Sequence, residues 1–354
     1  MAEHDELLYH AIHNNDENLQ RLILMPQESK TTYDPDSPRF CLDDQTEQQA
    51  LNKFRFGKED IHRLARSLAI PEQIQLPNRC ICSGTDALCI LLRRLVYPNR
   101  LSDLEALFGR PKSTLSLIIN YSLDVIYERH GYLLSSLDQP WFQQEALETY
   151  AEAINVKGAP LVNCFGFIDG TVRAICRPTR YQRVCYNGHK RVHALKFQSV
   201  VLPNGLIGHL FGPIEGRRHD CALLRLSGLM DQLEQRQLRT ADGIFFALYG
   251  DPAYPIRDYL LSPFKGAHLT EEENAFNQAM SFVRECAEWE FGKILTIFAF
   301  LDFKKNLKMF LQPVAKYHLV GALLANCHTC IYGNQTSNYF DLRPPLVEEY
   351  IHFA

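Results

Sequence analysis

The chain has 354 residues, 46% of them hydrophobic and 22% charged, so it can hold two domains, or one domain with an appendage, and a sizeable core, which argues against disorder. Its formal net charge of −4 excludes a polybasic nucleic-acid binder but leaves room for a local basic face. Eleven irregularly spaced cysteines, a polar start and no apolar run approaching ~20 residues predict reduced thiols, no secretory signal and no membrane contact.

The N-terminal part of the sequence has helical patterns. Residues 5–25 are predicted to form a helix, and the polar, proline-containing residues 26–50 are predicted to be a linker. From Phe54 to about Leu147 the pattern remains helical.

A short helix, a glycine turn and a longer helix are predicted within the sequence NRLSDLEALFGRPKSTLSLIINYSLDVIYERHG, after a helix that Thr85 can cap. Ser102 and Glu105 form a capping box, Gly109 ends the short helix, and the next begins near Ser113. This order is typical of a DNA-binding helix-turn-helix. On the pattern alone, however, an ordinary helical hairpin is the favoured interpretation.

After Val156 the pattern changes to buried strands. Residues 161–176 read as one strand, and the Asn204-Gly205 turn is predicted to join two more in a hairpin. A helix from Asp220 to Gln235, a strand ending at Asp251 and C-terminal helices complete an α/β sandwich. The expected domains are an N-terminal helix and linker (1–50), a helical domain (51–150), a catalytic domain (151–340) and a C-terminal tail (341–354).

Three acidic residues are the main functional candidates. Asp169 in FGFIDGT and Asp251 in YGDPAYP each follow an apolar run, and Glu288 lies on a long helical stretch. Because ligands gather at the carboxyl ends of strands in α/β sheets, Asp169 and Asp251 are predicted to lie near a common site. Mg²⁺ or Mn²⁺ prefers such oxygen ligands, and two ions can activate water and stabilise the leaving oxygen of a phosphodiester.

Glu288 has the weakest pattern of the three. Arg284 and Glu288 lie beside an apolar stripe, which places Glu288 at the edge of the buried face. For the helix alone, an exposed Arg284–Glu288 pair worth about 0.3–0.5 kcal/mol is the favoured alternative. The stripe consists of Val283, Ala287, Phe291, Leu295 and Phe298.

A basic segment without acids follows Asp169. No Asp or Glu occurs from Gly170 to Ile214, and we expect these side chains to hold the phosphates of a nucleic acid. Tyr181 and Tyr186 could stack on bases, although packing is the commoner role. The cations are Arg173, Arg177, Arg180, Arg183, Lys190, Arg191 and Lys196, accompanied by His189, His193 and His209.

Two other constellations are weaker. His219 and Asp220 in GRRHD could support the site, or Asp220 could simply cap the next helix. Cys327 and Cys330 resemble half of a zinc site, but without a second pair they are predicted to be structural thiols.

The ordered motifs resemble those of a PIF/Harbinger-type DDE transposase, or of a nuclease derived from one. The resemblance covers roughly residues 50–340, and the upstream segment DALCILLRRLVYPNRLSDLEALFGRPKSTLS is also similar to that family. The motifs are FGFIDGT, RVCYNGHKRVHALKFQSVVLPNGLIGHLFGP, GRRHD, GDPAYP and Arg284-x3-Glu288-x2-Phe291-Gly292.

The resemblance implies an RNase H-like catalytic domain preceded by an all-helical domain with a helix-turn-helix within residues 100–127. It places a DDE triad on Asp169, Asp251 and Glu288, holding two Mg²⁺ or Mn²⁺ ions. It also implies double-stranded transposon terminal repeats as substrate, a Myb/SANT-like accessory protein, and location in the nucleus and cytoplasm with partner-dependent import. A homodimer is compatible with the sequence. The weaker candidates for groove contacts are Lys112, Ser113, Thr114 and Asn120.

Three classes of function therefore compete. The leading one is a metal-dependent DNA endonuclease and transposase. The second is a domesticated, non-catalytic DNA-binding or scaffolding protein that keeps the transposase fold. The third is a glycosidase-like hydrolase with two carboxylic acids and no metal, which the acid-free basic segment disfavours.

Overall fold

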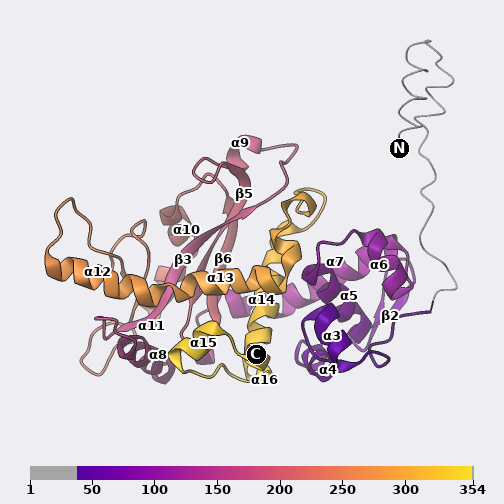
Figure 1. Cartoon of the computed structure of the whole chain (residues 1–354), viewed down its shortest axis with the longest axis horizontal. Coiled ribbons are helices and arrows are strands. Elements are labelled where there is room, and N and C mark those ends of the chain that lie inside the picture. The colour runs from indigo at the N-terminus through magenta and orange to yellow at the C-terminus, as the bar shows by residue number, and fades with distance from the viewer. Residues whose placement is uncertain (1–37, 353–354) are drawn as a thin grey trace, which may run out of the picture.

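A computed structural model describes residues 38–352, and its first part is helical (Figure 1). The predicted helix 5–25 and residues 26–37 of the predicted linker lie outside the described residues, and residues 47–50 of that linker belong to a helix. The elements are α3 (Glu47–Phe54), α4 (Lys58–Ser67), β1 (Gln73–Gln75), β2 (Ile81–Ser83), α5 (Gly84–Val96), α6 (Leu101–Phe108) and α7 (Lys112–His130).

The helix starts differ from the sequence predictions. Ser83, not Thr85, caps α5, because its hydroxyl accepts a hydrogen bond from the backbone N–H of Asp86 at 3.1 Å. The predicted Ser102–Glu105 capping box is absent. Instead, the Glu105 carboxylate is buried and accepts a hydrogen bond from the Lys112 N–H at 2.7 Å, joining α6 to the start of α7. Gly109, with a φ of 57°, ends α6 as predicted, since glycine adopts this left-handed conformation without strain.

A mixed sheet lies at the centre of the molecule, so the predicted α/β class is confirmed (Figure 1). The main order is β6-β5-β3-β7-β8, and the short β4 pairs with the start of β5. The β6-β5-β3 pairs are antiparallel, whereas β3-β7-β8 run parallel. The strands are β3 (Cys164–Ala174), β4 (Tyr186–Asn187), β5 (Val192–Val201), β6 (Ile207–Glu215), β7 (Ala247–Tyr249) and β8 (Leu260–Leu261).

The predicted hairpin at Asn204-Gly205 is present between β5 and β6. Gly205 has a φ of 82°, and the Asn204 side chain accepts a hydrogen bond from the Leu206 N–H at 3.1 Å. The positive φ of the glycine and the hydrogen bond of the asparagine side chain therefore form the turn that the Asn-Gly pair predicted.

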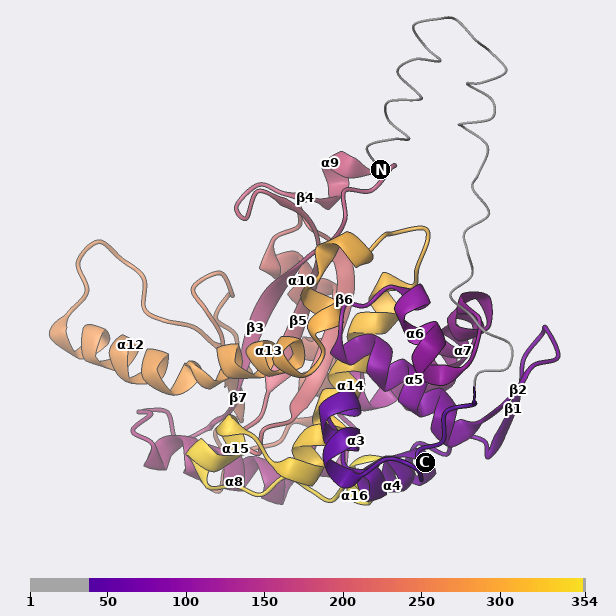
Figure 2. The ribbon, with the colours of Figure 1, turned by 45° about the vertical axis from the view of Figure 1, so that its right-hand side comes forward.

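Helices surround the sheet, and α12 extends away from it (Figures 1 and 2). The helix predicted from Asp220 to Gln235 is two helices, α10 and α11, because Gly228 between them has a φ of 64°. The long stretch that carries Glu288 is also divided at Glu285, into α12 and α13. These elements are η1 (Gly131–Leu134), η2 (Pro140–Phe142), α8 (Gln144–Val156), α9 (Gln182–Cys185), α10 (Asp220–Leu226), α11 (Leu229–Arg236), α12 (Glu271–Arg284), α13 (Cys286–Ile297), η3 (Ala299–Asp302), η4 (Lys304–Asn306), α14 (Val314–Tyr332), α15 (Gln335–Phe340) and α16 (Val347–Tyr350).

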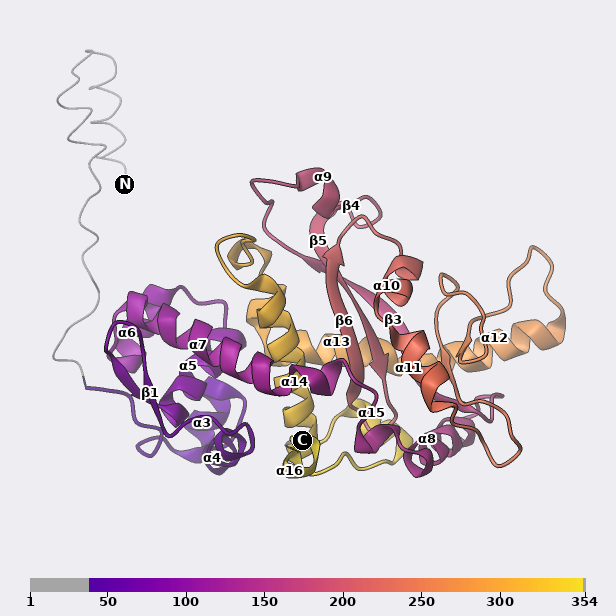
Figure 3. The same ribbon diagram turned by 180° about the vertical axis from the view of Figure 1, so that it is seen from behind.

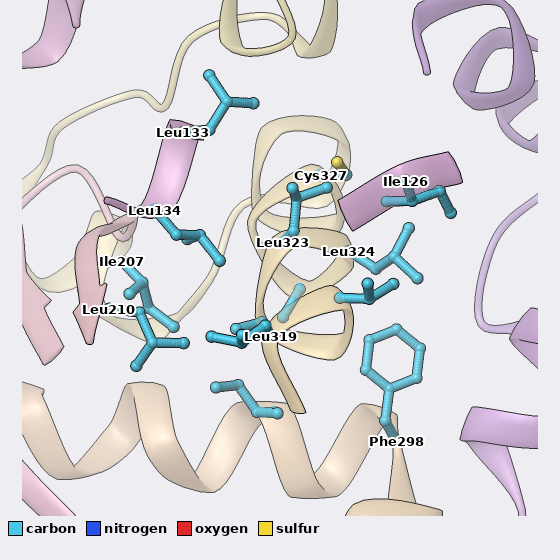
Figure 4. Packing of buried hydrophobic residues seen from close by; sticks show 14 of the residues in the cluster. Ile126, Leu133, Leu134, Ile207, Leu210, Phe298, Leu319, Leu323, Leu324 and Cys327 are labelled. Carbon is cyan, nitrogen blue, oxygen red and sulfur yellow. The ribbon is translucent and has the colours of Figure 1, made fainter. Parts of the chain in front are cut away.

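Helix α14 joins the helical part to the sheet. Seen from behind, α7 and α14 cross between the two parts (Figure 3). Around α14, Ile126 of α7 and Leu210 of β6 converge on Leu319, Leu323 and Leu324 (Figure 4). The larger of two apolar clusters among residues 38–352 therefore holds the helical part against the sheet, since α7 and β6 both pack on α14. The residues 341–352 of the predicted tail also pack, through buried Val347 and Tyr350 of α16.

All eleven cysteines lie within the described residues and are free, with Cys327 buried in α14. Between residues 38 and 352, no helix combines the length and apolarity that a membrane crossing requires.

The buried His209 on β6 predicts acid sensitivity. Burial lowers the pKa of this imidazole to about 4, so the folded state resists its protonation, whereas an unfolded histidine binds a proton near pH 6.5. Stability from this group is complete above pH 6.5 and declines as the pH falls towards 4, by about 2 kcal/mol at pH 5. Urea unfolding should show that the free energy of unfolding falls between pH 8 and pH 5 in both proteins. The fall should be smaller by about 2 kcal/mol in His209→Leu than in the wild type. An equal loss in both proteins would contradict the prediction.

Candidate active site

The sheet register brings Asp169 and Asp251 side by side. Strands β3 and β7 run parallel with Phe167 opposite Tyr249, so the residues two positions further along each strand are Asp169 and Asp251. Asp251 follows the end of β7, as predicted. Asp169 lies within β3, which continues to Ala174, because β5 keeps pairing with this strand beyond the apolar run.

The Asp169 carboxylate is mostly buried, with 17% of its side chain exposed. Burial raises its pKa to about 6. The Arg284 guanidinium and the Gly170 N–H, which donates to Asp169 Oδ1 at 2.9 Å, lower the pKa, and the Asp251 and Glu288 charges raise it further. Both other candidate acids are therefore close enough to Asp169 to act on its charge.

Arg284, at the end of α12, is turned towards the sheet. Its Nη2 lies 4.0 Å from Asp169 Oδ1, and only 18% of its side chain is exposed. The alternative of an exposed Arg284–Glu288 pair is therefore wrong, because Arg284 is directed at Asp169. This guanidinium offsets part of the cost of burying the carboxylate.

Glu288 is exposed on α13, at the rim of the site. With Arg284 and Glu285 it lines an open hollow of about 520 Å³. Across residues 38–352, no three His, Cys, Asp or Glu side chains are close enough together to hold a metal ion. The structure thus brings Asp169 and Asp251 close together and Glu288 near enough to act on the Asp169 charge, but the three carboxylates do not form a ready three-ligand group.

A buried ion pair lies directly beneath this edge of β3. Lys196 Nζ lies 2.6 Å from Asp220 Oδ1 and donates to the Arg218 carbonyl at 3.0 Å. A Cβ at Gly170 would lie 2.5 Å from Asp220 Oδ1, so the glycine after Asp169 lets the Asp220 carboxylate approach the strand. Asp220 therefore packs against the strand that carries Asp169 and does not cap α10, whose N-cap residue is His219.

His219, a sequence candidate, and Tyr254, which the sequence analysis did not single out, lie in different surroundings. The exposed His219 lines a separate hollow of about 460 Å³ with Cys221 and Arg225. Tyr254, in the same GDPAYP motif as Asp251, is a site residue that sequence reasoning missed. Its hydroxyl donates to Gln198 at 3.4 Å, and burial, with the charges of Asp220, Asp169 and Asp251, raises its pKa.

The cations predicted to contact DNA divide into two groups. Lys196 is buried in its ion pair, and Arg173 is partly buried with its guanidinium 5.3 Å from the Phe291 ring centre. Neither is placed to reach a phosphate, since β5 and β3 point these side chains inward. The exposed cations are Arg177, Arg180, Arg183, Lys190 and Arg191, and His189 is exposed beside them.

The candidates on α7 divide in the same way. Lys112, Ser113 and Asn120 are exposed. Thr114 is 5% exposed, and its hydroxyl accepts a hydrogen bond from Asn78 of the β1–β2 turn at 3.3 Å. Thr114 therefore positions the turn against α7 and is not available to a groove.

Comparison with known proteins gives one family and one curated relative. Residues 168–326 match the DDE superfamily endonuclease family. The chain is similar to "Protein ALP1-like" of Arabidopsis thaliana, with 24% identity over 222 residues, 60% of this chain and 52% of that protein. The chain thus spans about half the length of the curated relative it matches. No solved structure matches it.

Proposed function

We propose that this chain, whose residues 168–326 match the DDE superfamily endonuclease family, is a metal-dependent DNA endonuclease of the Harbinger-type, transposase-derived kind. The proposal rests on one observation above all. The parallel β3–β7 register, which brings Asp169 and Asp251 close to each other at the carboxyl ends of these strands, supports the proposal most strongly.

The strand order supports an RNase H-like catalytic domain. Counted from β3, the first three long strands form an antiparallel meander, and β7 and β8 add in parallel on the other side of β3. This arrangement puts the first strand at the centre of the sheet, where its side chains can meet those of the next parallel strand. Asp169 on β3 and Asp251 just after β7 then lie at the same end of these two neighbouring strands.

The carboxylates fit a divalent cation. Asp169 is mostly buried beside Asp251, and the positive charge that it contacts is a guanidinium at 4.0 Å. Two neighbouring carboxylates in such a place are stabilised by a hard cation with oxygen ligands. Asp169, Asp251 and Glu288 would be the residues that hold Mg²⁺ or Mn²⁺. The metal would supply charge neutralisation at the phosphodiester and a lowered pKa for water.

The proposed reaction begins with hydrolysis of a DNA strand. Water attacks phosphorus, the P–O bond to the leaving 3′-oxygen breaks, and the water's two protons pass to that oxygen and to solvent. The freed 3′-OH then attacks a second phosphodiester, where a new P–O bond forms, the P–O bond to that phosphodiester's own 3′-oxygen breaks, and the proton of the attacking hydroxyl passes to the departing 3′-oxygen. Strand β3 and the end of β7 hold the Asp169 and Asp251 carboxylates in place. Arg284 lowers the pKa of the buried Asp169 carboxyl, against the effect of burial, and so favours its ionised form.

The proposed substrate is double-stranded DNA at transposon terminal repeats. Helices α6 and α7 meet at Gly109 in the order of a helix-turn-helix, and Lys112 and Ser113 are exposed at the start of α7. The exposed cations after β3 would hold the DNA backbone. We further propose that the protein acts in the nucleus together with a Myb/SANT-like accessory protein. We also propose that it forms a homodimer.

The direct test is metal-dependent strand cleavage by the purified full chain. Supercoiled plasmid carrying the terminal repeats is incubated with Mg²⁺ or Mn²⁺, and nicked product is expected only with metal. Asp251→Asn should lower the cleavage rate at least about a hundredfold, because it removes one proposed metal ligand. Asp258→Asn is the matched control, since it neutralises an exposed carboxylate on the same segment.

Two outcomes would contradict the proposal. Metal-independent nicking would point to a different chemistry, and equal nicking by Asp251→Asn and wild type would remove the carboxylates from the reaction.

A second candidate function has its own supporting observation. Glu288 is exposed, and within the described part of the chain the acids do not form a three-ligand group. A DNA-binding scaffold that keeps the transposase fold needs no such group. DNA binding without cleavage under any divalent metal would favour this candidate over the nuclease.

A further inference from the structure

Two basic segments from distant parts of the chain form one surface at the α9 end of the sheet. The first is the loop and helix after β3, residues 175–191, and the second is the segment from η4 onwards, residues 303–312. Their side chains touch through the Tyr181 and Phe310 rings, whose centres lie 6.1 Å apart. We call the combined surface the basic cap, made of Arg177, Arg180, Tyr181, Arg183, Lys304, Lys305, Lys308 and Phe310.

Buried contacts hold the two segments together. The Cys176 N–H donates to the Leu307 carbonyl at 3.0 Å, and Cys185 Sγ lies 3.9 Å from Met309 Sδ. Leu307 and Cys185 are each 3% exposed and belong to the main core. The cap is therefore a fixed part of the fold and not a chance approach of two loops.

The charge of the cap has one sign. Neither segment contains Asp or Glu. All six cations of the cap are exposed, including the three lysines that the second segment adds. Such a surface on a chain of net charge −4 matches a polyanion.

The rings of the cap favour unpaired bases. Tyr181 is 66% exposed and Phe310 is 58% exposed, so both rings present faces to solvent among the cations. Bases inside a duplex are already stacked on one another, whereas an unpaired base can stack on an aromatic ring. Exposed rings interleaved with cations are the arrangement that proteins use for single strands.

We propose that the basic cap binds an unpaired DNA strand that continues from the duplex held at Asp169. This inference rests on the proposed DNA function. Strand β3 runs from Asp169 to Ala174 straight into the first segment, which puts the cap roughly 20 Å from the carboxylates at about 3.3 Å per residue. The lysines of the second segment, which sequence reasoning did not assign, belong to the same DNA surface.

The test is DNA binding by the full chain without metal, measured by fluorescence anisotropy. The probes are a blunt duplex of about twenty base pairs and the same duplex with a single-stranded tail of about ten nucleotides. Tyr181→Ala/Phe310→Ala should weaken binding of the tailed probe at least about tenfold, the effect of losing one stacked base, and leave the blunt probe unchanged. Tyr181→Phe keeps the ring and should retain wild-type affinity.

The lysines are tested through salt dependence. Lys304→Gln/Lys305→Gln/Lys308→Gln should lower the slope of log affinity against log salt by about 2, since each lost phosphate contact removes about 0.7–0.9. The matched control is Lys53→Gln/Lys58→Gln/Arg66→Gln, which removes three charges from α3 and α4 and should leave the slope unchanged.

The outcomes separate this inference from the nuclease proposal. Loss of tailed-probe binding in the ring variant supports the cap even when no metal cleaves the DNA. An unchanged affinity in the ring variant, or an unchanged slope in the lysine variant, overturns the cap while cleavage by the wild type still stands. Equal weakening on blunt and tailed probes also overturns it, because the cap would then hold duplex.

Discussion

Asp169→Asn is expected to abolish metal-dependent cleavage and, at the same time, to stabilise the fold. The carboxylate is a proposed metal ligand, so its loss should lower the cleavage rate at least about a hundredfold. Its folded pKa of about 6 also means that the ionised form is disfavoured in the folded state, by up to roughly 3 kcal/mol relative to the unfolded chain. Asparagine is similar in shape and avoids that cost.

The sign of the stability effect depends on pH. A raised carboxyl pKa lowers stability above the folded pKa, and this penalty disappears as the pH falls below the unfolded value of 3.8. Urea unfolding should therefore show Asp169→Asn more stable than wild type at pH 7, with the difference shrinking towards pH 4. Asp258→Asn, at an exposed site, should show no such gain. A less stable Asp169→Asn at pH 7 would contradict this account of the buried carboxylate.

Glu288→Gln is expected to affect cleavage without the change in stability that is expected for the buried Asp169. If Glu288 completes the metal site, cleavage falls as in Asp169→Asn. Stability should stay within about 0.5 kcal/mol, because the side chain is exposed. Unchanged cleavage in Glu288→Gln would remove this residue from the triad and leave Asp169 and Asp251 as the acids of the site.

Asp220→Asn is expected to destabilise the fold by about 3 kcal/mol or more. Lys196 is only 7% exposed, and Asp220 Oδ1 at 2.6 Å is its charged partner. Without that carboxylate the ammonium would be buried with only the Arg218 carbonyl, and breaking a buried pair from one side costs about 3–5 kcal/mol. Urea unfolding near pH 7 measures the change.

An exposed pair nearby provides the control. Arg218 and Glu215 lie 3.1 Å apart, with 43% and 41% of their side chains exposed. Glu215→Gln should therefore change stability by less than about 1 kcal/mol. Equal effects of Asp220→Asn and Glu215→Gln would show that the Lys196–Asp220 pair is no more important than a surface contact.

Local chemistry in the sequence was sufficient for several features of the fold. The Asn204-Gly205 turn, the end of α6 at Gly109 and the alternation of strands with helices follow from backbone preferences that neighbouring residues share. The α/β class and the endonuclease motifs were likewise readable from residues that lie close together in the chain.

Capping and charge were less predictable. Glu105 looked like the partner of Ser102, yet its carboxylate accepts the Lys112 N–H of the following helix. Thr114 and Lys196 looked like DNA contacts, yet one faces the Asn78 amide and the other pairs with Asp220. A polar side chain can have several partners within reach, and only the packing of distant elements selects among them.

The sequence by itself determined which acidic, basic and aromatic side chains this protein has, and whether they lie on helices, strands or loops. Only the tertiary structure decided which of them meet. Parallel pairing of β3 with β7 joins Asp169 to Asp251, and the core contacts of Leu307 and Cys185 join two basic segments into one surface. The physical reason is that local preferences act between near neighbours in the chain, whereas sheet register and core packing are set by burial across the whole molecule.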